Sequence, residues 1–316
     1  IGGAGYIGSR LVPALLAQDH EVTVFDLFWF GDYLPPPSVN LRKVKADAAS
    51  LTENDLKGFD CVVWLAGLSN DPMAEFSPLG NFIHNSAIAS YIAYISKRAG
   101  VRRFIHGGSC SVYGDASDLD HKASYEDIHK LKVTYPYGIA KLQAEIGAMK
   151  LADDNFNVIC LRKGTVSGWS PRMRFDLLIN TMFMSAMTTN TITVNNAYIW
   201  RPILGINDAI RMYCYFVNCD NGKSRIYNIV SENVKILDVA LRIASMLNPS
   251  PNVIVKNIED KRNYRADNEG KLDENVETIV TDLIENCCKS CDGQFDWMKD
   301  DRYYNIKTFK NIEFSL

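Results

Sequence analysis

The sequence predicts an α/β fold in which helices cover both faces of a doubly wound parallel sheet, with a smaller lobe toward the C-terminus. Two observations predict this class. The chain opens on a glycine-rich turn that leads at once into a helical pattern, and strand-like and helix-like segments then alternate through its first half. Such alternation is typical of parallel sheets with helices on both faces.

The first half supplies the predicted sheet. After the opening turn, Leu11, Leu15 and Leu16 recur at helical spacing, and a second amphipathic pattern over residues 85–100 ends at Gly100. Ligands of parallel sheets bind at the carboxyl ends of the strands, where the small and polar residues of this chain gather. Strands are predicted at residues 20–27, 60–67, 101–109 and 156–166, with one more short strand before Asp47.

The second half is less regular. Helices are predicted over residues 170–189, after a basic loop, and over residues 233–247, whereas residues 191–203 indicate a strand pair or a strand and a turn. Residues 265–316 give no clear pattern. Because neither a repeat nor a low-complexity linker interrupts the chain, this half is predicted to form a smaller lobe packed on the first.

Composition narrows the functional classes. With 316 residues, 47% of them hydrophobic, the chain is long enough for one large domain or two lobes. Its net charge of −3 implies no general attraction to nucleic acid or to an anionic membrane. No apolar run approaches the roughly 20 residues of a membrane span, and no signal-peptide pattern is present. We therefore expect a cytoplasmic protein.

The eight cysteines predict neither a disulfide framework nor a metal site. Most of them lie in apolar segments, where a free cysteine behaves as a small hydrophobic residue. Only Cys287, Cys288 and Cys291 have C-x-x-C spacing, and no second pair or nearby histidine completes a tetrahedral site. We expect no metal and a reducing compartment.

The opening turn predicts a dinucleotide site. Gly2, Gly5 and Gly8 let the backbone approach a pyrophosphate, whose charge is favoured by the amides at the start of the following helix. Asp26 ends the next strand 18 residues after Gly8, where a carboxylate can accept a ribose 2′-hydroxyl and would repel a 2′-phosphate. NAD is therefore favoured over NADP, against the alternative of a tight turn followed by an incidental aspartate. Two later strand ends add candidates that could equally be ordinary strand–loop junctions. The further cofactor candidates are Tyr6, Ile7, Asp47, Ala48, Leu65, Ala66 and Gly67.

A tyrosine and a lysine four residues apart predict acid–base chemistry. Tyr137 and Lys141 share one face of a helix, and a lysine ammonium near a phenol favours the phenolate. The spacing alone is weak evidence, because Tyr303 and Lys307 repeat it without a glycine turn or a serine-bearing strand nearby. Ser109, 28 residues before Tyr137, strengthens the prediction by ending a strand at the cofactor edge of the sheet.

Together, "GGAGYIGS", "LAGLSN", "GSCSVYG", "YGIAK", "LRKGTV" and "WRPILGIND" resemble the extended short-chain dehydrogenase/reductase family, in its NAD-dependent nucleotide-sugar epimerase and dehydratase branch. The resemblance runs from Ile1 to about Arg265. It implies a Rossmann-type NAD-binding domain over residues 1–167 with a return segment near 202–230, and a mainly substrate-binding lobe over residues 168–316. It also implies a short apolar strand before Ile1, with further residues missing around 265–275.

The same resemblance assigns roles to residues. Ser109, Tyr137 and Lys141 match the catalytic set, and Asn85 matches a position that supports the active site, although it could equally be an ordinary polar helix residue. Arg201 and Arg262 match arginines that hold the substrate diphosphate. Arg172 and Arg174 lie on a loop that either reaches the substrate or is simply solvated, and family members often dimerise through two helices, here 81–99 and 137–152. The predicted substrate contacts are Ser69, Asn70, Ser109, Ser111, Arg172, Arg174, Asn180, Arg201 and Arg262.

Departures from the family patterns reduce the number of reactions that the resemblance allows. Dehydratases of the family usually carry an Asp–Glu pair after the catalytic hydroxyl residue, but Cys110 and Ser111 follow Ser109 here. Cys110 is also one place away from the cysteine of the 3,5-epimerising members, so we interpret it as a packing residue. The prediction is a 4-epimerase of a nucleoside-diphosphate sugar that uses NAD without net turnover. The alternatives are an NAD(P)H-dependent 4-keto-sugar-nucleotide reductase and a catalytically silent NAD-binding sensor or scaffold.

Overall fold

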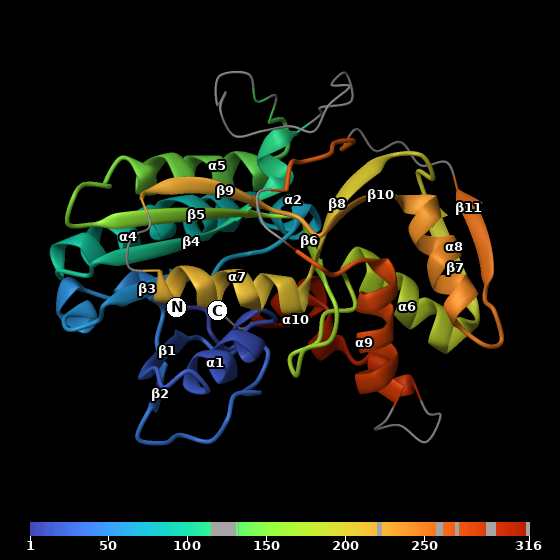
Figure 1. The fold of residues 1–316 in the computed structure, drawn as a ribbon, viewed down its shortest axis with the longest axis horizontal. Coiled ribbons are helices and arrows are strands. Elements are labelled where there is room, and N and C mark those ends of the chain that lie inside the picture. The colour runs from blue at the N-terminus through green and yellow to red at the C-terminus, as the bar shows by residue number, and fades with distance from the viewer. Residues whose placement is uncertain are drawn as a thin grey trace.

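The predicted parallel sheet is present. The computed structural model describes residues 1–114, 131, 133–219, 223–256, 262–268, 272–288 and 295–313. Four parallel strands form the central sheet in the order β3-β4-β5-β9, and β1 and β2 form a parallel pair beside it (Figure 1). Their bounds are β1 Val22–Asp26, β2 Leu41–Lys45, β3 Cys61–Trp64, β4 Arg103–Ser109, β5 Asn157–Lys163 and β9 Arg225–Ile229.

Ile1 and Gly2 join the β1–β2 pair to the central sheet. The nitrogen of Ile1 donates to the Val63 carbonyl (2.8 Å), and the Ile1 carbonyl accepts from the Leu65 amide (2.9 Å). The Gly2 amide donates to the Phe25 carbonyl (2.8 Å) on the other side. The opening glycine turn therefore starts between β1 and β3, at the carboxyl ends of the strands.

Helices cover both faces of the sheet, as predicted. Along β4, Ile105 packs with α1 and α7 in one buried cluster, whereas its neighbour Phe104 packs with α4 and α5 in another. Successive side chains of a strand point to opposite faces, so this division follows from the alternation of the strand. The four helices are α1 Gly8–Leu16, α4 Ile88–Arg98, α5 Pro136–Met149 and α7 Ile206–Asn218.

In the second half, the described residues build two smaller sheets and the α-helices α6, α8, α9 and α10, besides α7. Residues 191–203 do not form a strand pair: β7 pairs in parallel with β11, while β8 lies between β6 and β10. Asn196, with a positive φ of 57°, redirects the chain between β7 and β8. The predicted helix at 170–189 begins only at Leu178, because the basic loop before it is held by tertiary contacts described below. These elements are β6 Thr165–Ser167, β7 Thr191–Asn195, β8 Trp200–Gly205, β10 Glu232–Lys235, β11 Asn252–Lys256, α6 Leu178–Thr189, α8 Ile236–Met246, α9 Val276–Cys288 and α10 Asn305–Glu313.

The return segment near residues 202–230 stays a prediction, and the position of β9 bears on it. β9 belongs to the central sheet although it follows β7 and β8 in the chain, which lie in other sheets. The division of the chain at residue 167 stays a prediction. Three short helical turns complete the carboxyl edge of β3 and lead into α4. They are α2 Asp71–Phe76, α3 Pro78–Phe82 and the π turn Ile83–Ala87.

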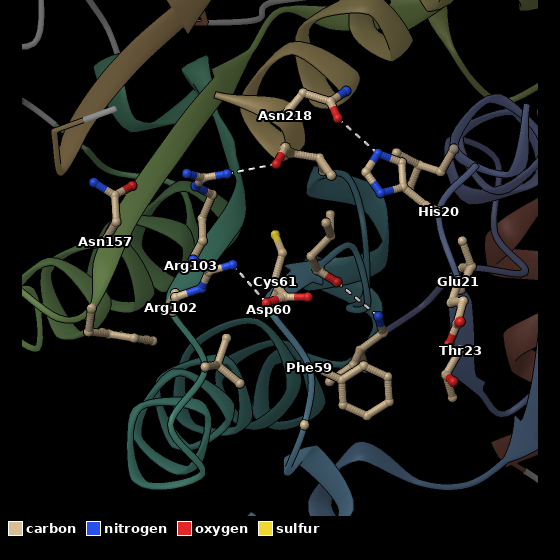
Figure 2. Close-up of a pocket in the computed structure, with 18 of the residues that line it drawn as sticks. His20, Glu21, Thr23, Phe59, Asp60, Cys61, Arg102, Arg103, Asn157 and Asn218 are labelled. Carbon is tan, nitrogen blue, oxygen red and sulfur yellow. Dashed lines mark hydrogen bonds and ion pairs between the residues drawn. The ribbon is translucent and has the colours of Figure 1, made fainter. Parts of the chain in front are cut away.

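A large cavity among the described residues lies at the edge of the sheet opposite to the predicted chemistry. It measures about 2040 Å³ and separates β1 from β3 near the amino ends of the strands. Figure 2 shows His20 and Thr23 on one side of it, opposite Arg103 and Asn157. Among the predicted site residues it includes only Gly8 and Leu65, so it is not the candidate active site.

Two negative findings concern the described part of the chain only. None of its helices is both long and apolar enough to pass through a bilayer. No group of three or more histidine, cysteine, aspartate or glutamate side chains among these residues is arranged to hold a metal ion. Cys291, part of the C-x-x-C spacing, lies outside the described residues, as do residues 269–271 of the segment where a gap was expected.

Candidate active site

The glycine turn lies tightly against the strand end that follows β3. Gly2 has a positive φ of 79°, and a Cβ on it would lie 2.4 Å from the Ala66 nitrogen. A Cβ on Gly8, the first residue of α1, would lie 2.3 Å from the Gly3 carbonyl oxygen. Only glycine fits at either position, and no side chain caps the start of α1. The Ser9 and Arg10 amides donate to the Gly5 and Ile7 carbonyls (2.9 and 3.1 Å), and the positive end of the helix dipole favours an anion beside the turn.

A second, smaller cavity of about 130 Å³ lies at the carboxyl ends of β1 and β3. Eight of the predicted cofactor residues line it. The apolar residues of the lining that the sequence analysis missed include Trp29, Phe30, Leu68 and Ile88. The run "LFWF" directly after Asp26 was the available signal for the two aromatic residues. The predicted residues in the lining are Gly2, Gly5, Asp26, Asp47, Ala48, Leu65, Ala66 and Gly67.

Asp26 is held at the mouth of this cavity by two backbone amides. Its Oδ2 accepts from the Ala4 amide (2.9 Å) and its Oδ1 from the Phe28 amide (2.8 Å). A carboxylate oxygen can accept more than one hydrogen bond, so both oxygens keep capacity for hydroxyl groups. The glycine turn and the acid are thereby fixed relative to each other before any ligand arrives.

Tyr6 does not direct its hydroxyl to this cavity. The hydroxyl donates to the Gly168 carbonyl (2.6 Å) and accepts from Asn180 Nδ2 (3.1 Å), so it ties the glycine turn to the loop before α6. Burial raises the pKa of the Tyr6 phenol far above its usual value. Ile7 occupies the N-cap position of α1 and does not line the cavity either.

Ser109, Tyr137 and Lys141 are brought together. The Ser109 hydroxyl and the Asn70 backbone lie close enough to the Tyr137 phenol to favour its ionised form. Lys141, one turn further along α5, donates from Nζ to the Gly107 carbonyl (3.1 Å) and lies 5.8 Å from the centre of the Tyr137 ring. The predicted catalytic set is therefore assembled at the carboxyl end of β4.

The predicted pKa of the phenol is wrong for the ligand-free protein. Burial, with a further contribution from the Asp71 carboxylate, raises the pKa of Tyr137 to about 12. Burial also lowers the pKa of Lys141 to about 8. Desolvation disfavours the charged form of both groups, and here it outweighs the attraction between phenolate and ammonium.

Asp71 is a functional candidate that the sequence analysis missed, although it directly follows "LAGLSN". Its Oδ2 accepts from Arg262 (2.7 Å), and its buried Oδ1 has no hydrogen-bond partner. Arg262 also lies 5.5 Å from the centre of the Tyr135 ring, two residues before Tyr137, the predicted catalytic tyrosine. The predicted diphosphate arginine thus lies next to the catalytic centre, paired with an acid.

Arg201 and Ser111 converge on a second missed residue, Tyr264. The guanidinium carbon of Arg201 lies 5.9 Å from the centre of the Tyr264 ring, and the Ser111 side chain lies close enough to the Tyr264 phenol to favour its ionised form. Tyr264 lies in the segment 262–268, whose sequence carries no periodic signal. Cys110, between the two serines, donates its thiol to the Arg162 carbonyl (3.3 Å), and burial raises its pKa to about 12, as expected of a packing residue.

Arg172 and Arg174 are buried, so a solvated basic loop is the wrong interpretation. Arg174 pairs with Asp176 through two hydrogen bonds and also donates to Ser69. Arg172, only 1% exposed, donates to Asn305 at the start of α10 and lies 3.9 Å from the centre of the Phe30 ring. The loop is therefore fixed beneath the strand end of β3 and behind the aromatic wall of the small cavity.

The two predicted asparagine contacts are engaged within the protein. Asn180 is fully buried, and its amide bonds to the Gly168 amide, the Tyr6 hydroxyl and the Arg174 carbonyl. Asn70 caps α2 by accepting from the Met73 amide (3.0 Å). Asn180 thus holds the basic loop, and the backbone of Asn70 reaches Tyr137.

Comparison with known proteins places this geometry in a family. A sequence profile of the NAD dependent epimerase/dehydratase family matches residues 1–230. The UDP-glucose 4-epimerase of Neisseria meningitidis serogroup C is 27% identical over 179 residues, which are 51% of this chain and 50% of that relative. The chain thus spans about half the length of the curated relatives it matches.

Solved structures show the same fold. MoeE5 in complex with UDP-glucuronic acid and NAD superposes with a TM-score of 0.79 at 24% identity, over 92% of this chain and 98% of that chain. TunA, an NAD dependent NDP-hexosamine 5,6-dehydratase involved in tunicamycin biosynthesis, superposes with a TM-score of 0.77 at 25% identity, over 92% and 97% of the two chains. The Rossmann-type fold and the resemblance to extended short-chain dehydrogenases/reductases are confirmed, and the chain belongs to the NAD dependent epimerase/dehydratase family.

Proposed function

We propose that the protein is an NAD-dependent epimerase of a nucleoside-diphosphate sugar, acting at C4 through a transient 4-keto sugar. The observation that carries the proposal is that Ser109, at the carboxyl end of β4, lies close to the Tyr137 phenol, with Lys141 one helical turn away. Relatives named UDP-glucose 4-epimerase support the choice of reaction.

The residues around the small cavity fit NAD. The glycine turn leaves no room for a Cβ at Gly2, which suits close approach of a pyrophosphate, and the apolar walls suit a flat base. Asp26 would accept the ribose hydroxyls and would repel a 2′-phosphate. When bound, the nicotinamide supplies an acceptor that takes a hydride from the sugar and returns it.

Proton transfer is assigned to Tyr137. As the phenolate, it removes the proton of the C4 hydroxyl during oxidation, and as the phenol it returns the proton during reduction. Ser109 donates to the sugar oxygen, and Lys141 stabilises the phenolate. Because burial raises the pKa of Tyr137 to about 12, the phenolate needs a positive charge beside it, and the Lys141 ammonium, one turn along α5, is the group assigned to supply it.

The diphosphate is assigned to Arg201 and Arg262. Arg201 lies against the ring of Tyr264, which is close to Ser111. Arg262 pairs with Asp71, which lies beside Tyr137. A guanidinium matches phosphate oxygens with paired N–H groups, which gives orientation as well as charge. Arg262 already pairs with Asp71. Binding of a diphosphate to Arg262 would therefore change how far the charge of Asp71 is neutralised.

Three rival functions differ in their products. A dehydratase would release water, and Asp71, whose charge raises the pKa of Tyr137, is an acid that could serve it. A 4-keto reductase would consume reduced nicotinamide stoichiometrically. A sensor or scaffold would retain NAD and yield no product at all.

The test is incubation of the purified protein with UDP-, GDP-, dTDP- and CDP-sugars without added cofactor, followed by NMR of the sugar. Formation of the C4 stereoisomer supports the epimerase. A strict requirement for stoichiometric reduced nicotinamide, loss of water from the sugar, or bound NAD without any product would each overturn it in favour of the corresponding rival.

A further inference from the structure

Two buried asparagines lie between the small cavity and the catalytic helix. Asn81 belongs to α3 and Asn85 to the π turn that follows it, four residues along one continuous helical stretch, and neither side chain is exposed. π turns are rare and are frequent at functional sites. Buried amide groups in proteins are nearly always hydrogen bonded, so their partners show what the turn holds in place.

The hydrogen bonds of these two residues run in one line. Asn85 donates from Nδ2 to the Leu68 carbonyl (2.7 Å) and to Asn81 Oδ1 (2.8 Å), and Asn81 donates from Nδ2 to the Pro136 carbonyl (2.9 Å). Leu68 lines the small cavity, and Pro136 is the first residue of α5, directly before Tyr137. The line therefore starts at the wall of the cavity and ends next to the catalytic phenol.

The roles of the two amides are not interchangeable. Asn85 uses both of its N–H groups in this line, and Asn81 both accepts and donates. A side chain at position 81 must therefore offer an acceptor and a donor at the same time, with the reach of an amide. The π turn packs directly on α5, so a displacement of one of these two elements would displace the other.

The side-chain oxygen of Asn85 lies close to Gly67, on the side of Lys141. Its Oδ1 has no hydrogen-bond partner, and a Cβ on Gly67 would lie 2.1 Å from it. The same position on Gly67 lies 4.0 Å from Lys141 Nζ. Gly67, with a positive φ of 138°, leaves the space that this oxygen occupies.

We propose that Asn81 is a positioning residue of the catalytic centre, which couples the Gly67–Leu68 wall to the placement of Tyr137 through Asn85. The inference rests on the proposed function, because it assigns Tyr137 the reacting proton. Asn81 itself does not line the small cavity and is not the group that bonds to the Tyr137 phenol. It acts by fixing the first turn of α5, so that filling the cavity and aligning the phenol occur together.

The test compares Asn81→Asp and Asn81→Ser with Ser96→Ala. The aspartate keeps the acceptor for Asn85 but loses the donor to Pro136, whereas serine is too short to bridge both partners. Ser96 is equally buried on α4, but its hydroxyl donates to the Ile92 carbonyl (2.7 Å) of its own helix, so its removal leaves the line intact. All variants are first checked for folding by circular dichroism.

The readouts are the ¹³Cζ resonance of Tyr137 over a pH titration with NAD present, assigned by its absence in Tyr137→Phe, and kcat and KM for the sugar nucleotide. We expect both Asn81 variants to move the resonance and to lower kcat about 10- to 100-fold with KM nearly unchanged, because small misplacements of a catalytic group cost rate. The Asp variant also raises the pKa of the phenol, whereas Ser96→Ala changes none of these.

A Tyr137 resonance and pH profile that match Ser96→Ala in both Asn81 variants would overturn the inference. The result for Asn81 can be distinguished from the result for the proposed function. Failure of the parent protein to convert any sugar nucleotide overturns the function, and the resonance still decides whether Asn81 positions Tyr137.

Discussion

Arg262 and Asp71, 191 residues apart, form an ion pair beside Tyr137, the proposed catalytic tyrosine. The distance between Arg262 Nη1 and Asp71 Oδ2 is 2.7 Å, and the other carboxylate oxygen is buried without a hydrogen-bond partner. The negative charge of Asp71 raises the pKa of the Tyr137 phenol, after burial itself. The pair therefore links a group assigned to the diphosphate with the charge that the phenol experiences.

Asp71→Asn is predicted to shift the acid limb of log(kcat/KM) to lower pH. Removal of the negative charge makes the phenolate easier to form, so the pKa of Tyr137 falls and the active form is present at lower pH. The measurement is a pH–rate profile for the free enzyme and substrate. Asp60→Asn, in an exposed ion pair with Arg102, is the control and should leave the profile unchanged. An unmoved or upward-shifted limb in Asp71→Asn would contradict this.

Tyr137→Phe is predicted to lower kcat by at least about 100-fold while NAD stays bound, because the ring is retained and only the proton-transfer group is lost. Tyr303→Phe is the matched control, since Tyr303 and Lys307 have the same spacing outside the assembled site. Turnover is followed by product NMR and bound NAD by its absorbance after denaturation. Activity in Tyr137→Phe near that of Tyr303→Phe would show that another group moves the proton.

Asp26→Asn is predicted to weaken NAD binding and to reduce the preference for NAD over NADP by about tenfold or more. The carboxylate accepts from two backbone amides and faces the expected ribose, so loss of its charge removes the repulsion of a 2′-phosphate. Fluorescence titration with both nucleotides checks this, with Asp32→Asn at the exposed pair with Lys43 as the control. Equal affinity of the parent protein for NAD and NADP would argue against the role of Asp26.

Glu145→Gln is predicted to destabilise the fold by about 3–5 kcal/mol, because it leaves the Arg162 charge buried without its partner. Both side chains are fully buried, and Arg162 Nε donates to Glu145 Oε2 at 2.8 Å. Glu53→Gln, in an exposed pair with Arg98, should change the free energy of unfolding little. Urea titration of both variants measures the difference, and similar midpoints would contradict the prediction.

Ile146→Glu is predicted to shift a homodimer toward monomer. Ile146 on α5 and Tyr94 on α4 are 38% and 50% exposed, on the two helices through which we expect two copies to associate. Leu241→Glu on α8, whose parent side chain is 51% exposed, is the matched control. Light scattering after size exclusion gives the mass, and a parent protein that is monomeric at micromolar concentration would refute the dimer.

The elements of the site that depend on local rules were predictable. Parallel strands end at one edge of a sheet, so Asp26 and Ser109 had to lie on the same side. Tyr137 and Lys141 had to share a helix face because they are four residues apart. The glycine spacing likewise required a tight turn before α1.

The elements that depend on distant partners were not predictable. Arg172 is buried because Asn305, 133 residues later, accepts its hydrogen bond, and no periodicity connects the two. Asp71 could not be matched to Arg262 for the same reason. The raised pKa of Tyr137 reflects how completely the folded chain excludes water, which spacing alone does not encode.

The most direct test of the account follows one atom of the substrate. A nucleoside-diphosphate sugar that the protein converts is supplied with deuterium at C4, and the product is analysed by NMR and mass spectrometry without added cofactor. The proposed mechanism predicts the C4 epimer with its deuterium retained at C4, because the same hydride leaves and returns within one closed site. A product that has lost the deuterium from C4, or that has gained solvent hydrogen at C5 with loss of water, would contradict it.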